Sequence, residues 1–220
     1  MTSKLLQFWE IFLDLFFPRT QIADLIPIQS QIQIDEAPAL DLSSTYTKLD
    51  TVIVASDYEL IKPVLIRFKY HFEKYLAADL GYILYQKVNQ KLQQKELILP
   101  DFITFVPGDK KRVAARGFNS PELLAKILSK KLALKSMDIF LKSKTTVAQA
   151  KQDRSQRLQN LNQVFELKPS NQLDLNQIKH IWLIDDVIAT GTTVSLLSEL
   201  LKSKYPQILI TTIVLARTEA

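Results

Sequence analysis

HIWLIDDVIATGTTVSLLSELL, residues 180–201, begins as a strand-like segment and ends as a helix-like one. Four apolar residues, 181–184, precede the adjacent acids Asp185 and Asp186. A short apolar run bounded by a turn predicts a buried strand. A buried carboxylate costs about 2 kcal/mol or more unless it is neutralised or hydrogen-bonded. The acids therefore need donors or a cation, and a ligand can supply either.

The turn after the acids carries the groups that bind a phosphate. It consists of Ala189, Thr190, Gly191, Thr192 and Thr193, with helical sequence behind it. A glycine permits tight turning, and the free amides and dipole of a helix N-terminus favour an anion. An Asp-rich turn with a threonine helix cap would use the same residues for local hydrogen bonds. The complete order of strand, acids, turn and helix favours the ligand site over that alternative.

This segment resembles the 5-phosphoribosyl-1-pyrophosphate (PRPP) motif of type I phosphoribosyltransferases. The resemblance implies that Asp185 and Asp186 contact the ribose hydroxyls and that residues 189–193 hold the 5′-phosphate. It also implies Mg²⁺ that is held mainly through the ligand near the two acids, with no metal site made by the protein alone.

Short strand-like segments alternate with segments of helical periodicity along the rest of the chain. The predicted strands are 102–106, 139–141, 181–184 and 208–215, and the predicted helices are 63–70, 72–94, 121–132 and 193–204. Pro63 is expected in the first turn of its helix. The alternation predicts an α/β fold with a mostly parallel central sheet flanked by helices, which is the fold that the resemblance implies.

A basic segment follows the first of these strands. Val106 and Pro107 lead into Lys110, Lys111 and Arg112, and RGFN follows at 116–119. A cationic loop after a strand suits a pyrophosphate or a nucleic-acid backbone, although a solvated charged loop has the same composition. The segment resembles VPxxxxRxxxRGFNQ of ComF proteins. The resemblance aligns Arg112 and Arg116, which become candidate catalytic residues, with Lys111 as a further pyrophosphate ligand.

The stretch 146–165 carries a second set of polar side chains. Gln149, Arg154 and Arg157 match the ComF spacing, and the resemblance makes this stretch a loop that closes over the site and excludes water. Periodicity alone would favour an ordinary surface helix. The segments LLQFWEIFLDLFFP at 5–18 and FKYHF at 68–72 extend the ComF likeness over most of the chain.

Composition limits the chemistry and the partners. The net charge of +5 favours anionic partners. The chain has no cysteine, so it can form neither a disulfide nor a thiolate zinc site. Many ComF proteins carry a zinc ribbon near residues 19–26, where this chain reads RTQIADLI, so no zinc is expected. Packing or surface roles are expected for His71 and His180.

Two domains are predicted, an N-terminal helix and cap at 1–50 and a phosphoribosyltransferase-like domain at 51–220. The apolar segment 5–17 is shorter than the roughly 20 residues that span a bilayer and contains Glu10 and Asp14, so we expect no transmembrane segment. A secretory signal is not expected either, which predicts a cytoplasmic protein.

The expected function is binding of PRPP or a related phosphoribosyl ligand with Mg²⁺. If the protein is an enzyme, the expected reaction is phosphoribosyl transfer to a nitrogen nucleophile with release of pyrophosphate. The alternative is a non-catalytic protein that binds PRPP or a nucleotide during DNA uptake, and single-stranded DNA or DNA-uptake proteins would then be partners. A methyltransferase or dinucleotide binder is disfavoured, because no G-x-G-x-x-G follows a strand. The acceptor is expected to contact the cap between about residues 18 and 57.

Overall fold

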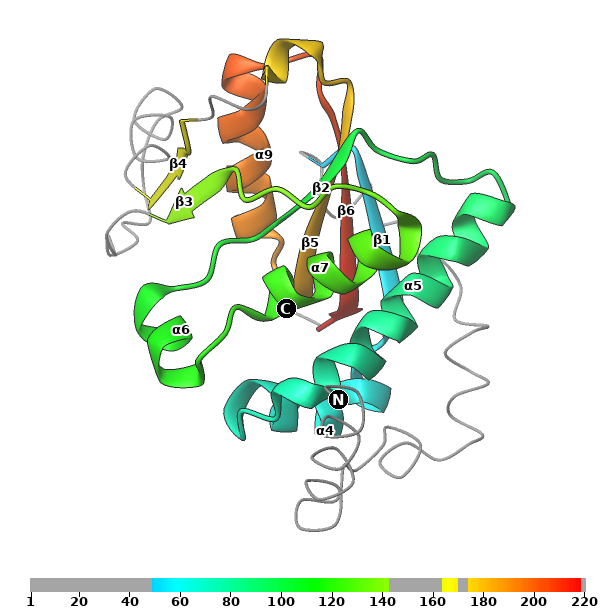
Figure 1. Cartoon of the computed structure of the whole chain (residues 1–220), viewed down its shortest axis with the longest axis vertical. Coiled ribbons are helices and arrows are strands. Elements are labelled where there is room, and N and C mark those ends of the chain that lie inside the picture. Colours follow the sequence, from blue (N-terminus) through cyan, green and yellow to red (C-terminus); the bar gives the residue numbers. More distant parts are fainter. Residues whose placement is uncertain (1–48, 143–163, 170–173, 219–220) are drawn as a thin grey trace, which may run out of the picture.

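The computed structural model describes residues 49–142, 164–169 and 174–218. A four-stranded parallel sheet with the order β1-β6-β5-β2 lies at its centre (Figure 1). The strands are β1 (Thr51–Asp57), β6 (Leu209–Arg217), β5 (His180–Ile188) and β2 (Phe102–Phe105). All four run in one direction, so their carboxyl ends meet at one edge of the sheet.

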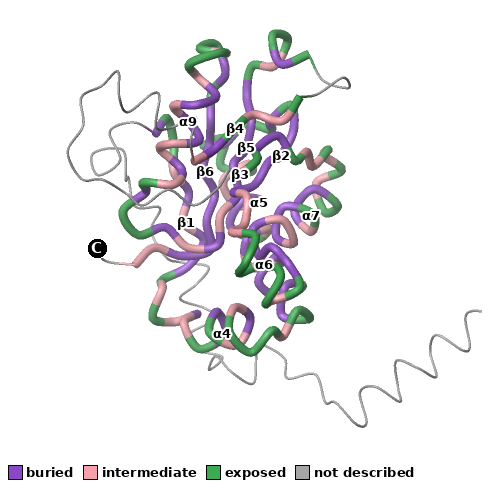
Figure 2. Tube along the Cα trace, turned by 90° about the vertical axis from the view of Figure 1, so that its left-hand side faces the viewer, coloured by how far each residue is buried: buried purple, intermediate pink, exposed green. Residues whose placement is uncertain are grey.

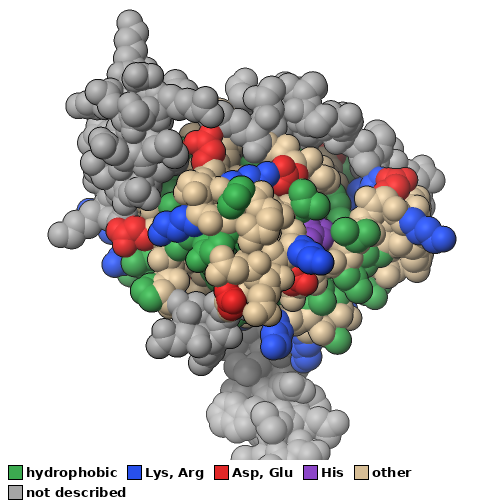
Figure 3. Space-filling view, turned by 90° about the horizontal axis from the view of Figure 1, so that it is seen from above, with side chains coloured by type: hydrophobic (Ala, Val, Ile, Leu, Met, Phe, Trp, Pro, Cys, Tyr) green, Lys and Arg blue, Asp and Glu red, His purple; other side chains and the backbone are tan. Residues whose placement is uncertain are grey.

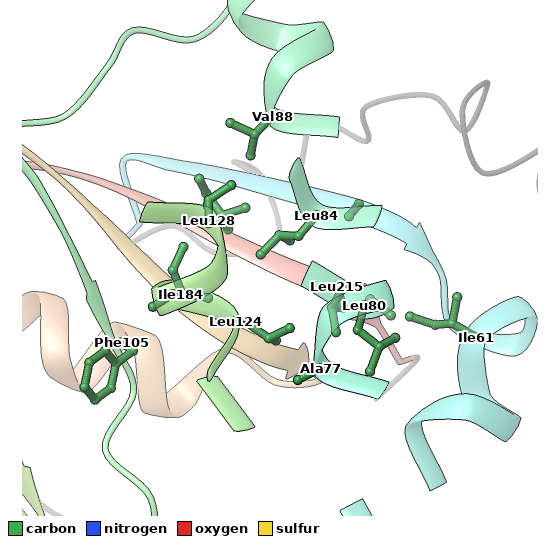
Figure 4. Close-up of a cluster of buried hydrophobic side chains, with 14 of the residues drawn as sticks. Ile61, Ala77, Leu80, Leu84, Val88, Phe105, Leu124, Leu128, Ile184 and Leu215 are labelled. Carbon is green, nitrogen blue, oxygen red and sulfur yellow. The ribbon is translucent and has the colours of Figure 1, made fainter. Parts of the chain in front are cut away.

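Apolar side chains cover β5 on both faces. Ile181 and Leu183 belong to one hydrophobic cluster, whereas Trp182 and Ile184 belong to the other. Successive side chains of a strand point to opposite faces, so an unbroken apolar run suits a strand buried on both sides. Figure 2 shows the buried strands at the centre of the fold, and Figure 4 shows one of the clusters.

Three helices pack into the cluster that contains Trp182: α4 (Tyr58–Tyr70), α5 (Ala77–Gln93) and α7 (Ser120–Leu132). The other face is covered by α9 (Thr192–Lys204) and by an antiparallel hairpin of β3 (Phe140–Lys142) and β4 (Phe165–Leu167). Two 3₁₀ turns, η1 (Lys74–Leu76) and η2 (Leu175–Gln177), and the short helix α6 (Lys110–Arg116) complete the described elements.

The structure corrects several predicted elements. Residues 51–57, predicted as part of the cap region that contacts the acceptor, form β1, an edge strand of the main sheet. The helix predicted from residue 63 begins at Tyr58, where the Asp57 carboxylate accepts a hydrogen bond from the Glu59 N–H. Pro63 therefore lies inside the helix and not in its first turn. The strand predicted at 139–141 belongs to the separate β3–β4 hairpin.

The basic segment is also organised differently from the prediction. Residues 110–116 form α6 and not a loop, because the Asp109 side chain caps the first turn. Its carboxylate accepts hydrogen bonds from the N–H groups of Lys111 and Arg112 at 3.1 and 3.3 Å. Gly117, in the left-handed conformation with φ 80°, ends the helix. The cations are thus held on a short, capped helix.

The N-terminal helix and cap predicted at 1–50 lie almost entirely outside the described residues, so the division at residue 50 stays a prediction. Within the described ranges, every helix is too short or too polar to cross a lipid bilayer.

Candidate functional site

Asp185 and Asp186 lie near the carboxyl end of β5, two residues before its last residue, Ile188. The Val106 N–H donates to the Ile184 carbonyl at 3.0 Å, so the chain leaving β2 passes beside the acids. The 189–191 turn then leads into α9. The carboxyl edge of a parallel sheet is the usual place for a ligand in α/β folds.

A lysine from a distant part of the sequence partners one of the two acids. Lys69 Nζ lies 2.7 Å from Asp186 Oδ1, with 18% and 12% of the two side chains exposed. Lys69 is the second-last residue of α4, whose C-terminal end therefore lies next to the carboxyl edge of the sheet. Sequence reasoning did not assign Lys69 to the site. The available signal was the FKYHF segment, which carries this lysine within the ComF likeness.

Among the described residues, no cation forms an ion pair with Asp185. Its Oδ1 accepts the Asp186 N–H at 2.8 Å. Desolvation by the surrounding protein, followed by the nearby charge of Asp186, raises the pKa of Asp185 to about 8, although some of the residue still touches solvent. One lysine thus balances one carboxylate, and the second carboxyl group is held neutral at pH 7.

The turn after β5 has the geometry of an anion site. Gly191 adopts the left-handed conformation with φ 69° and, as the N-cap residue of α9, has no side chain to cap it. The Thr192 N–H makes only a long hydrogen bond, 3.5 Å, to Thr190 Oγ1. The hydroxyls of Thr190 and Thr192 are 2.9 Å apart, and both residues are exposed, as is Ala189. First-turn amides have no partner within their helix. The turn therefore offers amides and hydroxyls to solvent, with Thr193 half-buried behind them.

Arg116 of α6 is connected to α4 through a series of side-chain contacts. Arg116 donates to Ser120 Oγ at 2.6 Å, and its guanidinium lies 5.8 Å from the centre of the Phe118 ring. Phe118 in turn stacks on Phe68 of α4 with ring centres 5.1 Å apart. Phe68 precedes Lys69, which contacts Asp186. Arg116 is thus connected through two aromatic rings to the helix that carries Lys69, and its own distance from the acids stays a prediction.

The other predicted cations fall into two groups. Lys111 and Arg112 are exposed on α6, with their N–H groups held by Asp109. Gln149, Arg154 and Arg157 lie outside the described residues, so their positions stay predictions.

Two cavities lie near these elements. One of about 360 Å³ lies between β2, α6 and the β3–β4 hairpin, with Gly108, Lys110 and Lys142 among its lining residues. The other, of about 280 Å³, lies between α5 and β1. The acid pair lines neither, so its candidacy comes from its chemistry and not from a deep pocket.

The described residues contain no cluster of three or more acidic or histidine side chains that could hold a metal ion. Two adjacent carboxylates remain at the site. Mg²⁺ keeps several waters and binds one or two carboxylates together with phosphate oxygens. The donor set therefore fits an ion that arrives with a phosphorylated ligand.

Comparison with known proteins identifies the family. A phosphoribosyl transferase domain family matches residues 120–220. Competence protein F of Haemophilus influenzae is 31% identical over 153 residues, which make up 69% of this chain and 66% of that protein. The chain belongs to the ComF type of phosphoribosyltransferase-like proteins. The DNA utilization protein YhgH of Escherichia coli K12 is 29% identical over 152 residues, 68% of this chain and 65% of that protein.

The α/β architecture is accordingly the type I phosphoribosyltransferase fold. The part of this ComF-type chain that matches the domain includes β5, the acid pair, the turn and α9, whereas the cations of α6 precede it. The chain spans slightly less than two thirds of the length of these relatives.

Proposed function

We propose that this protein binds PRPP, with Mg²⁺, at the carboxyl edge of the sheet. The observation that carries the proposal is the sequence of groups along one backbone: two acids in β5, a turn with the exposed hydroxyls of Thr190 and Thr192, and the N-terminus of α9, whose N-cap is a glycine. The acids would accept hydrogen bonds from the ribose hydroxyls. The amides and hydroxyls of the turn would bind the 5′-phosphate.

The charges of the acid pair support this assignment. A carboxyl group with a pKa of about 8 is kept neutral at pH 7 by its surroundings. Strongly shifted pKa values are common among the residues of functional sites. A cation or hydroxyl donor next to Asp185 would favour its ionised form. Ligand binding is therefore expected to release a proton at pH 7, while Lys69 keeps Asp186 oriented.

Asp185 and Asp186 are the residues that would contact Mg²⁺, directly or through water. The ion would supply charge neutralisation for the pyrophosphate oxygens. Arg112 and Arg116, with Lys111, are the candidates for binding pyrophosphate from the protein side. Gln149, Arg154 and Arg157 remain candidates for the segment that covers the site.

We propose further that the bound phosphoribosyl group is transferred to a nitrogen nucleophile. The nitrogen lone pair would form a bond to C1 of the ribose, and the bond from C1 to the pyrophosphate oxygen would break with its electron pair. Positive charge develops on the sugar in such a step, and an ionised Asp185 would offset it.

The second candidate is a non-catalytic protein that binds PRPP or a nucleotide during DNA uptake. The relatives named competence protein F and DNA utilization protein favour a link to DNA. Single-stranded DNA or uptake proteins would be its partners, in the cytoplasm. The basic helix α6 could contact a phosphate backbone, and such binding would weaken steeply with salt.

Calorimetry with PRPP and Mg²⁺ tests the binding site. The wild type is compared with the double variant Asp185→Asn, Asp186→Asn, and with Glu96→Gln, an exposed acid after α5 that lines neither cavity, as a control. The double variant should lose at least about 100-fold in affinity, because two charge-assisted contacts are removed. Equal affinity of the double variant and the wild type would remove the site assignment.

Pyrophosphate release separates the two candidates. An enzyme releases pyrophosphate from PRPP in the presence of an amine or nucleobase acceptor, and a binding protein is stabilised by PRPP without release. Absence of release with a broad acceptor panel, together with tight PRPP binding, would favour the accessory role.

A further inference from the structure

Three exposed aromatic residues gather at the end of α4. Tyr70 ends the helix with 67% of its surface exposed, Phe72 follows with 51%, and Tyr75 in η1 has 39%. We call Tyr70, Phe72 and Tyr75 the aromatic corner. Single exposed apolar residues are ordinary, but three within six positions form an exposed patch, and such patches often mark binding surfaces.

The backbone of the corner holds Phe72 in an unusual conformation. Its φ is 61°, in the left-handed region, at a position after a helix where glycine is most common. Lys95 and Ala133 adopt the same conformation after α5 and α7, but neither is aromatic. A bulky residue at such a φ with half its side chain in solvent is poorly explained by packing alone.

A rigid network supports the corner from below. Arg67 Nε and Nη2 donate to the two carboxylate oxygens of Glu73 at 2.8 and 2.6 Å. The Tyr75 hydroxyl also contacts Glu73 and Arg67. The N–H groups of His71 and Glu73 donate to the Arg67 carbonyl. The exposed rings are therefore carried by an ordered turn, as a stacking surface requires.

The corner begins at the residue after the lysine of the candidate site. Tyr70 directly follows Lys69, and the Cα atoms of these two consecutive residues are about 3.8 Å apart. Lys69 contacts Asp186. The charges of the corner suit a neutral or anionic ring: Arg67 neutralises Glu73, while Lys74 is exposed beside the rings. Aromatic side chains stack on any planar base, and nearby cations attract its phosphate.

We propose that the aromatic corner binds the planar heteroaromatic ring of the acceptor, so that the nitrogen nucleophile is part of a nucleobase-like ring. The proposal rests on the proposed function and assigns its acceptor side. It places acceptor recognition at 70–75, a surface different from the 18–57 region that the sequence suggested.

The test compares ligands with and without a base. Ribose 5-phosphate and the nucleoside 5′-monophosphates of adenine, guanine, cytosine and uracil are titrated into the full chain, with uncharged nucleosides in parallel. The variants are Tyr70→Leu and Phe72→Leu, which keep apolar bulk but remove the ring. Tyr82→Leu, on α5 with 48% exposure, is the matched control. Unfolding temperatures within about 2 °C of wild type show that the variants fold.

At least one nucleotide should bind more tightly than ribose 5-phosphate. Tyr70→Leu and Phe72→Leu should each weaken that nucleotide about 5- to 100-fold and leave ribose 5-phosphate unchanged, whereas Tyr82→Leu should change neither. Nucleotide affinities equal to that of ribose 5-phosphate, or insensitive to both variants, would overturn the corner proposal and leave the phosphoribosyl site intact.

Two further outcomes are informative. Failure of ribose 5-phosphate and PRPP to bind the wild type would reject the proposed function, while nucleosides that lose affinity in the corner variants would still support a base-binding corner. If only a single-stranded oligonucleotide responds to the variants, the corner is a strand-binding surface and the acceptor proposal is wrong.

Discussion

The pKa values of acidic side chains are shifted in opposite directions at the two ends of β5. At the amino end, Asp101 Oδ2 accepts the N–H groups of Lys179 and His180 at 2.8 and 3.0 Å, and these bonds lower the pKa of Asp101. At the carboxyl end, burial and a like charge raise the pKa of Asp185 to about 8. Two amides from a distant part of the chain bind the Asp101 carboxylate, whereas the Asp185 carboxyl group accepts the amide of its neighbour Asp186.

A second acid at the amino end repeats the pattern of Asp101. Asp50 Oδ2 accepts the Ile210 N–H at 2.9 Å, and the other carboxylate oxygen pairs with Lys202. Figure 3 looks onto this end of the molecule, where acidic, basic and hydrophobic side chains lie next to one another. Asp101 and Asp50 accept hydrogen bonds from amides that are distant in the sequence, and these contacts serve the fold. An acid pair with a single lysine has capacity left for a ligand.

The largest expected effect comes from neutralising the acids at either end. Asp185→Asn should raise the free energy of unfolding by about 3 kcal/mol at pH 8, because the folded state no longer has to hold a carboxyl group away from its preferred ionisation. Asp101→Asn should lower it by about 1 kcal/mol, since water screens this exposed acid. Urea unfolding measures both, and equal signs for the two variants would break the comparison.

The pH dependence of the same two variants follows from the directions of the pKa shifts. Asp185 loses its proton near pH 4 in the unfolded chain but only near pH 8 in the folded protein. The contribution of this group to the free energy of unfolding therefore falls as the pH rises from about 4 to about 8. The gain from Asp185→Asn should therefore vanish below about pH 4. The lowered pKa of Asp101 gives stability above about pH 4 that is lost in acid.

The next effect concerns the lysines at the two ends. Lys69→Met should cost about 2 kcal/mol at pH 7, because it leaves Asp186 buried without its cation. Lys202→Met should cost about 0.5 kcal/mol, since the Asp50 pair is about 30% exposed. Adding Asp186→Asn to Lys69→Met should restore most of the loss. Equal costs for the two lysines, measured by urea unfolding, would contradict the distinction between the two ends.

The smallest expected effect is a change in ligand affinity that leaves the stability of the protein unchanged. Arg112→Gln should leave the unfolding temperature unchanged, because Arg112 is exposed, and should weaken PRPP about tenfold by removing a pyrophosphate contact. Ribose 5-phosphate, which has no pyrophosphate, should bind as before. Lys126→Gln, on the exposed surface of α7, is the control. A parallel loss for ribose 5-phosphate would place Arg112 elsewhere in the site.

The sequence predicted three of the four strands of the sheet and missed β1, one of its two edge strands. The run 181–184 is unbroken and apolar, so β5 was evident, and the helices with clear apolar spacing followed. β1 was missed because its apolar run, residues 52–55, is short and directly follows irregular sequence. α6 was missed because its seven residues carry no apolar period, and only the Asp109 cap and Gly117 define it.

The site divides along similar lines. The acids and the turn are contiguous, so their proximity could be predicted from the sequence. The contact between Lys69 and Asp186 joins positions 117 residues apart, and no local pattern specifies it. The electrostatic difference between Asp185 and Asp101 depends on which amides surround each carboxylate, and only the folded chain determines this.

Proton release on ligand binding tests the central claim most directly. PRPP with Mg²⁺ is titrated by calorimetry at pH 7 in two buffers of different ionisation enthalpy, for the wild type and Asp185→Asn; the difference between the proteins removes protons released by the ligand itself. We expect the wild type to release close to one proton more than Asp185→Asn and to bind more tightly. Binding of equal strength with equal proton release would show that Asp185 does not receive the ligand.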